Sequence, residues 1–281
     1  MIRRLGLTVV VAGMALAGMV GLSAGTAAAA PGCGDYHWIG AAGSGQRDAA
    51  GMMSNGGMGG AVFQSYQQLS SALAASGYTM TAEAVQYPAA PVPVEDGLGG
   101  WMDFMDSVEE GTDAAADQFA AYTERCPDTK VVLAGYSQGA MVIHRNLDDL
   151  ADDPHVAAAL LIADGDRLPG DTTFNMGSAA SVPGGKGVAQ EHSFLASAPT
   201  SPLPPEIGAR TISVCDVGDP VCDFDPDVNS EVTAAGIAIH TAYVPAASGA
   251  HAWGTPLYQL VMANAPTAAL PSSTELSAAG A

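Results

Sequence analysis

The feature that most constrains the fold of this chain is the pentapeptide Gly135-Tyr136-Ser137-Gln138-Gly139, a G-x-S-x-G pattern. It follows an apolar run at residues 131–134 and precedes the apolar residues 140–143, as expected of a turn between a strand and a helix. In such a nucleophile elbow the serine occupies a strained turn, and glycines flank it because side chains there would collide with neighbouring backbone. Because the chain has 34 glycines, the pattern alone can arise by chance, and its meaning depends on the residues around it.

The N-terminus has the composition of a secretory signal peptide. Arg3 and Arg4 are followed by an apolar stretch at residues 5–22 and an alanine tract at 27–30, the order typical of a cleaved leader. We therefore predict a signal peptide over residues 1–29, in preference to an uncleaved membrane anchor. The remaining ~250 residues suffice for one α/β domain, which we expect over residues 30–265.

The charge of the chain excludes several classes of partner. Its formal net charge is −20 and becomes −22 once Arg3 and Arg4 leave with the signal peptide. Such an acidic chain is poorly suited to nucleic acid, and it lacks the basic patch that docks proteins on anionic lipid headgroups. A neutral or apolar substrate fits better.

Four cysteines remain in the exported chain, and an even number in an oxidising compartment predicts two disulfides. Of the three possible pairings, the most economical joins Cys33 to Cys126 and Cys215 to Cys222, because the last two flank a short turn. A zinc site is disfavoured because neither C-x-x-C nor a nearby histidine pair is present. We predict no metal and no cofactor.

The hydrophobic pattern alternates between strands and helices. Strands are predicted at 36–42, 78–87, 131–134, 156–162, 209–214 and 236–239, and helices at 59–76, 108–125 and 254–263. This alternation predicts an α/β fold, a three-layer sandwich with a central parallel sheet and its function at the carboxyl ends of the strands. Residues 165–208 have no clear period and are predicted as a long surface excursion. Residues 266–281 are predicted as a flexible tail.

A serine nucleophile needs a histidine to take its proton and an acid to orient that histidine. Asp219 lies just beyond a predicted strand, inside the loop that a Cys215–Cys222 bridge would close. The competing acids nearby are Asp216, Asp223 and Asp225. For the base, His240 follows a predicted strand and His251 precedes the closing helix, so the residues alone leave both open.

Three segments resemble the signature blocks of the cutinase family of serine esterases, especially its actinobacterial cutinase-like branch. They are the pentapeptide around Ser137, the Gly218-Asp219-Pro220-Val221-Cys222 segment and the His240-Thr241-Ala242-Tyr243 segment, and Cys126-Pro127 also matches. The resemblance implies an α/β-hydrolase fold with Ser137 as nucleophile, Asp219 as orienting acid and His240, rather than His251, as base. It also implies the Cys33–Cys126 and Cys215–Cys222 bridges.

The same resemblance implies an oxyanion hole built from the backbone N–H of Gln138 and a donor at Ser44. The chain departs from the family at this turn, because Ala42 stands where many members have arginine. Four apolar residues after a glycine-rich stretch either line an acyl groove or pack in the core: Trp101, Met102, Phe104 and Met105.

These observations predict a secreted serine esterase that hydrolyses carboxylic esters of the fatty-acyl, lipid or polyester type through an acyl-enzyme. The alternatives are an acyltransferase on the same fold and a non-catalytic lipid- or wall-binding protein. We expect an extracellular or cell-wall monomer that acts on a neutral or apolar ester, makes transient contact with lipid surfaces and does not bind nucleic acid.

Overall fold

The computed structural model of the protein describes residues 32–93, 97–182, 184–192, 199–227, 233–243 and 251–265. The predicted signal peptide and the predicted tail at 266–281 lie outside these residues. At the centre is a parallel six-stranded sheet with the strand order β2-β1-β3-β4-β6-β5. Its strands are β1 (Tyr36–Ala41), β2 (Met80–Ala84), β3 (Lys130–Tyr136), β4 (Val156–Ile162), β5 (Phe174–Met176) and β6 (Thr211–Val214).

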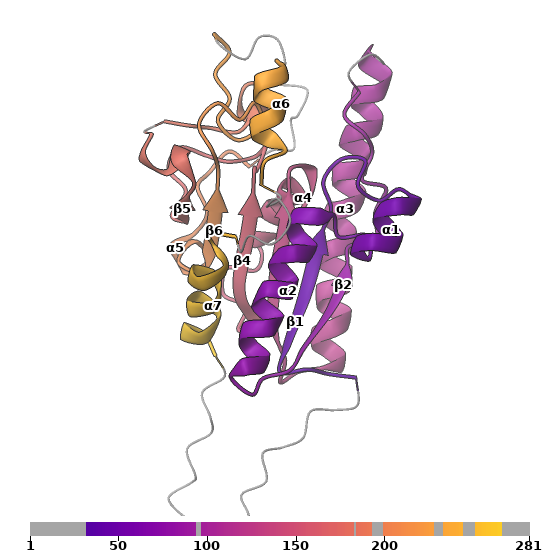
Figure 1. Ribbon diagram of the computed structural model, residues 1–281, viewed down its shortest axis with the longest axis vertical. Helices are drawn as coiled ribbons and strands as arrows, with labels where there is room; N and C mark the ends of the chain where they lie inside the picture. Colours follow the sequence, from indigo (N-terminus) through magenta and orange to yellow (C-terminus); the bar gives the residue numbers. More distant parts are fainter. Residues whose placement is uncertain are drawn as a thin grey trace, which may run out of the picture.

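Helices cover both faces of the sheet (Figure 1). Helices α2 (Gly60–Ala75) and α7 (Gly254–Ala263) lie on one face, and α3 (Gly97–Arg125) and α4 (Gln138–Leu147) lie on the other. The remaining helices are short: α1 (Ala49–Asn55), α5 (Pro205–Gly208) and α6 (Ala234–His240), with 3-10 turns η1 (Ser178–Ser181) and η2 (Val188–Gln190). The predicted three-layer α/β/α sandwich is therefore confirmed.

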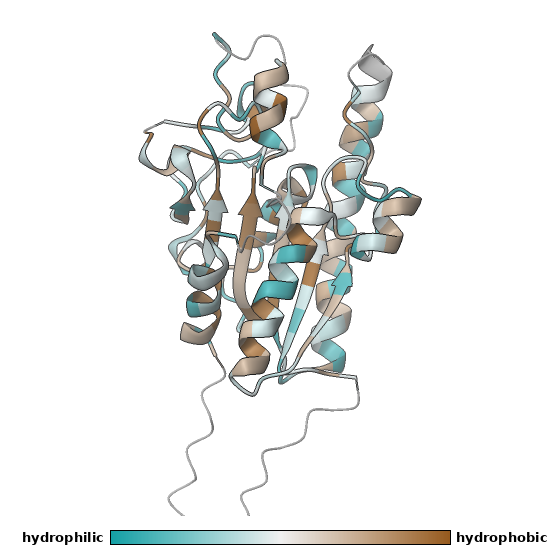
Figure 2. Cartoon of the chain, viewed as in Figure 1, coloured by the Kyte–Doolittle hydropathy of each residue, from teal (hydrophilic) through white to brown (hydrophobic). Residues whose placement is uncertain are grey.

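The central strand β4 is apolar along its whole length because helices α4 and α7 cover its two faces. Strand β4 has the sequence VAAALLI and is buried throughout, and Figure 2 shows it in the brown of hydrophobic residues. Alternate side chains enter two separate cores. Leu133 and Leu161 belong to the core beneath α3 and α4, whereas Leu160 and Ile162 belong to the core beneath α2 and α7.

Two of the predicted elements differ from the structure in type or by more than ten residues at one end. Residues 236–239 form no strand: they belong to helix α6, whose N-cap Thr233 accepts a hydrogen bond from the Gly236 N–H. The helix predicted over 108–125 begins at Gly97, eleven residues earlier. The glycines at its start favour a loop by propensity, but Trp101, Phe104 and Val108 recur at helical spacing and pack against or within the core.

The segment at 165–208 is more than a surface excursion. It supplies β5, the edge strand that pairs in parallel with β6, and it supplies the short helix α5. The predicted strand at 209–214 is confirmed as β6 but begins at Thr211, after that helix. The excursion therefore adds to the sheet as well as running over its surface.

The topology places a ligand site at the carboxyl ends of β1 and β3. After β1 the chain forms β2 on one side of β1 and then crosses to form β3 on the other side. The direction in which strands are added therefore reverses between β1 and β3. Crevices outside such a switch point are where open α/β sheets bind their ligands. Within the described residues, no helix is long and apolar enough to span a bilayer.

Candidate active site

Ser137 occupies the sharp turn between β3 and α4. It has a φ of 54° and a ψ of −120°, which is strained for a residue with a side chain. A Cβ at Gly135 would lie 2.0 Å from the Gly139 oxygen, and a Cβ at Gly139 would lie 2.2 Å from the Ala41 oxygen. Both glycines of the motif are therefore required by close backbone approach, as the sequence predicts for a nucleophile elbow.

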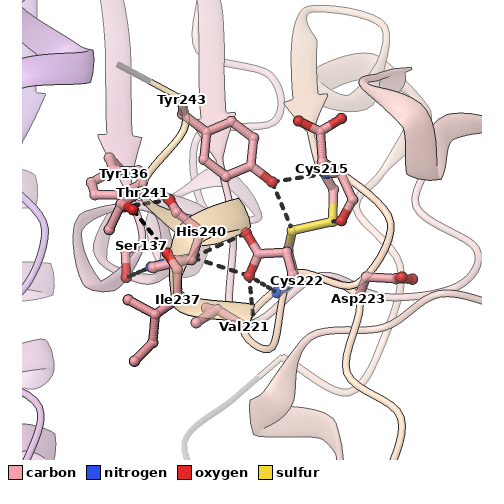
Figure 3. A network of polar contacts seen from close by, with 12 residues as sticks. Tyr136, Ser137, Cys215, Val221, Cys222, Asp223, Ile237, His240, Thr241 and Tyr243 are labelled. Carbon is pink, nitrogen blue, oxygen red and sulfur yellow. Dashed lines mark hydrogen bonds and ion pairs between the residues drawn. A yellow bond between two sulfur atoms is a disulfide. The ribbon is translucent and has the colours of Figure 1, made fainter. Parts of the chain in front are cut away.

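A continuous chain of hydrogen bonds joins Ser137, His240 and Asp219. Figure 3 shows His240 with its ring turned toward Ser137. The Ser137 Oγ lies 3.0 Å from Nε2 of His240. On the other side of the ring, Nδ1 of His240 lies 3.0 Å from each carboxylate oxygen of Asp219. An acid placed in this way holds the imidazole with Nε2 toward the serine, the arrangement needed to take a proton from a hydroxyl.

Asp219 is fully buried and held by its own loop. Its Oδ1 accepts hydrogen bonds from the backbone N–H groups of Val221 at 2.7 Å and Cys222 at 3.4 Å. Both predicted disulfides are present: Cys215–Cys222 closes this loop, and Cys33–Cys126 joins residues 93 positions apart. The loop therefore restricts the acid both covalently and by hydrogen bonds.

The competing acids have other partners. Asp216 accepts hydrogen bonds from the backbone and side chain of Ser178, and Asp223 accepts one from the Gly218 N–H. Asp225 accepts one from the Asp227 N–H. Only Asp219, among the described acidic residues, contacts His240.

The alternative base, His251, lies elsewhere in the fold. Its ring stacks on Trp253 at 4.1 Å, and its backbone N–H donates to the Gln68 side chain of α2. Burial lowers the pKa of His251 to about 4. The structure thus places His251 in the packing between α2 and α7, and it places His240 against Ser137.

Two tyrosines flank the His240 ring, and neither is among the site residues predicted from the sequence. The Tyr136 ring stacks on it at 5.3 Å and the Tyr243 ring meets it edge-on at 6.5 Å. The Tyr243 hydroxyl accepts the Asp216 N–H at 2.8 Å, so it is anchored to the acid loop. Burial, helped by the Asp219 carboxylate, raises the pKa of both phenols above the ordinary value. Their positions could have indicated a role at the site, because Tyr136 lies in the pentapeptide around Ser137 and Tyr243 in the segment that begins at His240.

The predicted oxyanion donors lie on the two neighbouring strand ends. Gln138 opens α4, and its N–H belongs to the first turn, where helical N–H groups have no intrahelical acceptor. Ser44 follows β1, and its buried Oγ has no hydrogen-bond partner among the described residues. The turn is held in place because the Tyr87 hydroxyl donates to the Ala42 oxygen and the Gly45 N–H donates to Ala89.

The four predicted groove residues have different environments on the first turns of α3. Phe104 is buried in the core, and Trp101 and Met105 are partly buried against that core. Met102 is 61% exposed. Core packing thus accounts for Phe104, whereas the groove prediction stays open for the other three.

The sequence model of the cutinase family matches residues 32–254. The chain is 30% identical over 151 residues to Cutinase 11 of Verticillium dahliae, covering 50% of this chain and 48% of that protein. It is 30% identical over 152 residues to carboxylesterase Culp1 of Mycobacterium bovis, covering 53% and 55%. In these alignments the chain spans about half the length of the curated relatives it matches.

The fold is also found among solved structures. An acetylxylan esterase superposes with a TM-score of 0.56 at 23% identity, covering 83% of this chain and 100% of that chain. At this identity the likeness concerns the fold alone, and the family assignment depends on the sequence match across most of the chain. The protein is a member of the cutinase family.

Proposed function

We propose that this protein is a serine esterase that hydrolyses carboxylic esters through an acyl-enzyme. The observation that carries the proposal is the hydrogen-bonded series Ser137, His240 and Asp219 at the switch point of the sheet. Membership of the cutinase family supports the same chemistry.

In the proposed reaction the Ser137 Oγ attacks the carbonyl carbon of the ester while Nε2 of His240 takes its proton. The negative charge on the carbonyl oxygen is stabilised by the Gln138 N–H and by a donor at Ser44, and each such donor typically lowers the barrier by about 3 kcal/mol. Collapse of the intermediate expels the alcohol, which receives the proton from His240. Water then attacks the acyl-enzyme by the same steps and releases the acid.

Exposed apolar side chains support an apolar ester substrate and transient contact with a lipid surface. All but one of the large hydrophobic side chains that are exposed among the described residues lie on connections that follow the carboxyl ends of strands: Met52, Met53, Val92, Met102, Val182, Val217 and Ile237. Figure 2 shows hydrophobic residues on α6, beside the candidate base. Two disulfides support an oxidising, extracellular location. We propose that the secreted form is a monomer in which one domain over residues 30–265 is followed by the tail at 266–281.

A fluorophosphonate probe tests the proposal, because it phosphonylates only an activated serine. We expect the protein to be labelled, Ser137→Ala to lose all labelling, and the control Ser213→Ala, a buried serine of β6, to keep it. A folded wild-type protein that takes no label would instead support the non-catalytic alternative. Product analysis with and without an added alcohol then distinguishes hydrolysis from acyl transfer.

A further inference from the structure

Tyr136 connects the candidate nucleophile to the candidate base. It is the last residue of β3, directly before Ser137, and is 6% exposed. Its hydroxyl donates a hydrogen bond to the backbone oxygen of His240 at 2.7 Å, and its ring stacks on the imidazole with an angle of 24° between the planes (Figure 3). One side chain thus contacts both the backbone and the ring of His240.

The helix that carries His240 has little support of its own. Helix α6 has seven residues, of which Gly236 alone is buried, and Ile237 is 51% exposed. So short a helix is not stable in isolation, and its position depends on contacts with the rest of the fold. Tyr136 is well placed to supply such a contact, because it is the last residue of β3, a central strand that pairs with β1 and β4.

The Tyr136 ring also contacts the candidate oxyanion turn. A Cβ at Gly43 would lie 2.6 Å from the Tyr136 ring, so the turn that carries Ser44 packs directly against it. The ring therefore contacts both this turn and the His240 imidazole. Burial keeps the phenol protonated by raising its pKa, so the hydroxyl stays a donor over the working pH range.

The contact between Tyr136 and His240 matters more at one stage of the proposed reaction than at another. The inference therefore rests on the proposed esterase function. In the resting enzyme the Ser137 Oγ bonds to Nε2 of His240. In the acyl-enzyme that oxygen is esterified and has no proton to donate. The His240 ring must nevertheless stay in place to activate water. The contacts that remain are Asp219 at Nδ1 and the Tyr136 hydroxyl at the backbone oxygen of His240.

We propose that the Tyr136 hydroxyl is a positioning group that keeps His240 aligned with the reaction centre, above all while the acyl-enzyme is hydrolysed. It touches neither the substrate nor the transferred proton. The variable second residue of the G-x-S-x-G motif thus has a defined role in this chain.

The test is Tyr136→Phe, which keeps the ring and removes only the hydroxyl. The matched control is Tyr122→Phe, because Tyr122 is also buried, stacks on His37 at 3.5 Å and uses its hydroxyl in a 3.0 Å bond to Thr81. Both variants are compared with the wild type on a p-nitrophenyl ester by steady-state and stopped-flow kinetics. Thermal unfolding is measured in parallel.

We expect Tyr136→Phe to lower kcat about tenfold through slower deacylation, since small misplacements of a catalytic group have effects of this order or larger. KM should not rise, a burst of p-nitrophenol should become more pronounced, and Tm should change no more than in the control. Equal kcat in the two variants, or a loss of kcat that merely follows a fall in Tm, would overturn the positioning role. An inactive, unlabelled wild-type protein would instead refute the proposed esterase function.

Discussion

A buried ion pair on α4 should make the stability of this protein fall at alkaline pH. His144 lies two turns after Ser137, and its Nδ1 lies 2.5 Å from a carboxylate oxygen of Asp164, which follows β4. Both residues are 1% exposed. Burial alone would lower the pKa of His144, but the Asp164 carboxylate outweighs it and raises the pKa from 6.5 to about 9.

The sign and size of the effect follow from proton linkage. The native protein keeps a proton on His144 up to about pH 9, whereas the unfolded chain releases it near pH 6.5. The stabilisation is therefore fully present below pH 6.5 and is lost as the pH rises through 9. At about 1.36 kcal/mol per pH unit, the loss over this interval is about 3 kcal/mol, a large part of the 5–15 kcal/mol typical of a domain.

Other charged groups packed around His144 contribute to the pH dependence and require a control. Burial raises the pKa of both Asp166, which is paired with Arg145, and Asp171. These groups also bind protons more tightly when folded, so they lower stability as the pH rises through their own range. A variant that lacks only the histidine separates its contribution from theirs.

The assay is urea unfolding between pH 6 and pH 9.5. We expect the wild type to lose about 3 kcal/mol of unfolding free energy over this range, and His144→Gln to lose much less because it has no imidazole to titrate. His155→Gln is the control, since His155 pairs with Asp153 at 2.9 Å but its side chain is 28% exposed. Parallel stability curves for the wild type and His144→Gln would refute the reasoning.

Three further predictions concern the proposed site. Gly139→Ala places a Cβ 2.2 Å from the backbone oxygen of the last residue of β1, so urea unfolding should show a loss of about 1–3 kcal/mol, and an unchanged midpoint would contradict the close-approach argument. Replacing Cys215 and Cys222 together by alanine opens a bridge between residues only seven positions apart, so we expect a loss of about 2 kcal/mol but a larger loss of kcat, because the candidate acid becomes mobile. His240→Ala should abolish hydrolysis of a short-chain ester while His251→Ala destabilises the fold and leaves hydrolysis measurable; the reverse result would identify the other histidine as the base.

The three candidate residues that meet in the structure could be chosen from the sequence because their order along the chain follows from the proposed chemistry. A serine on an elbow requires an acid and a histidine beyond later strands, and the blocks around Asp219 and His240 occur in that order. Strands β3 and β4 are equally predictable because two buried faces demand a continuous apolar run.

The errors arise where long-range contacts override local preference. Ile237 and Ile239 in the run at 236–239 favour a strand by propensity, yet among the described residues the run pairs with no strand, and Thr233 caps it as a helix. Strand β5 has only three residues and forms through its pairing with β6. Neither feature has a local sequence signal strong enough to predict it.

Two ion pairs between α4 and the segment after β4 also depend on long-range contacts that the local sequence does not reveal. His144 and Arg145 are adjacent on α4, and they pair with Asp164 and Asp166, which are separated by Gly165. A Cβ at Gly165 would lie 2.8 Å from the Met141 side chain of α4, so Gly165 allows the segment between the two carboxylates to pack closely against the helix. The pairing of His144 with Asp164 could not be predicted from the sequence, because nothing local links His144 to a segment 20 residues later. The two pairs join α4, which begins directly after Ser137, to the segment that follows β4. We therefore expect a loss of either pair to affect the position of Ser137 through α4.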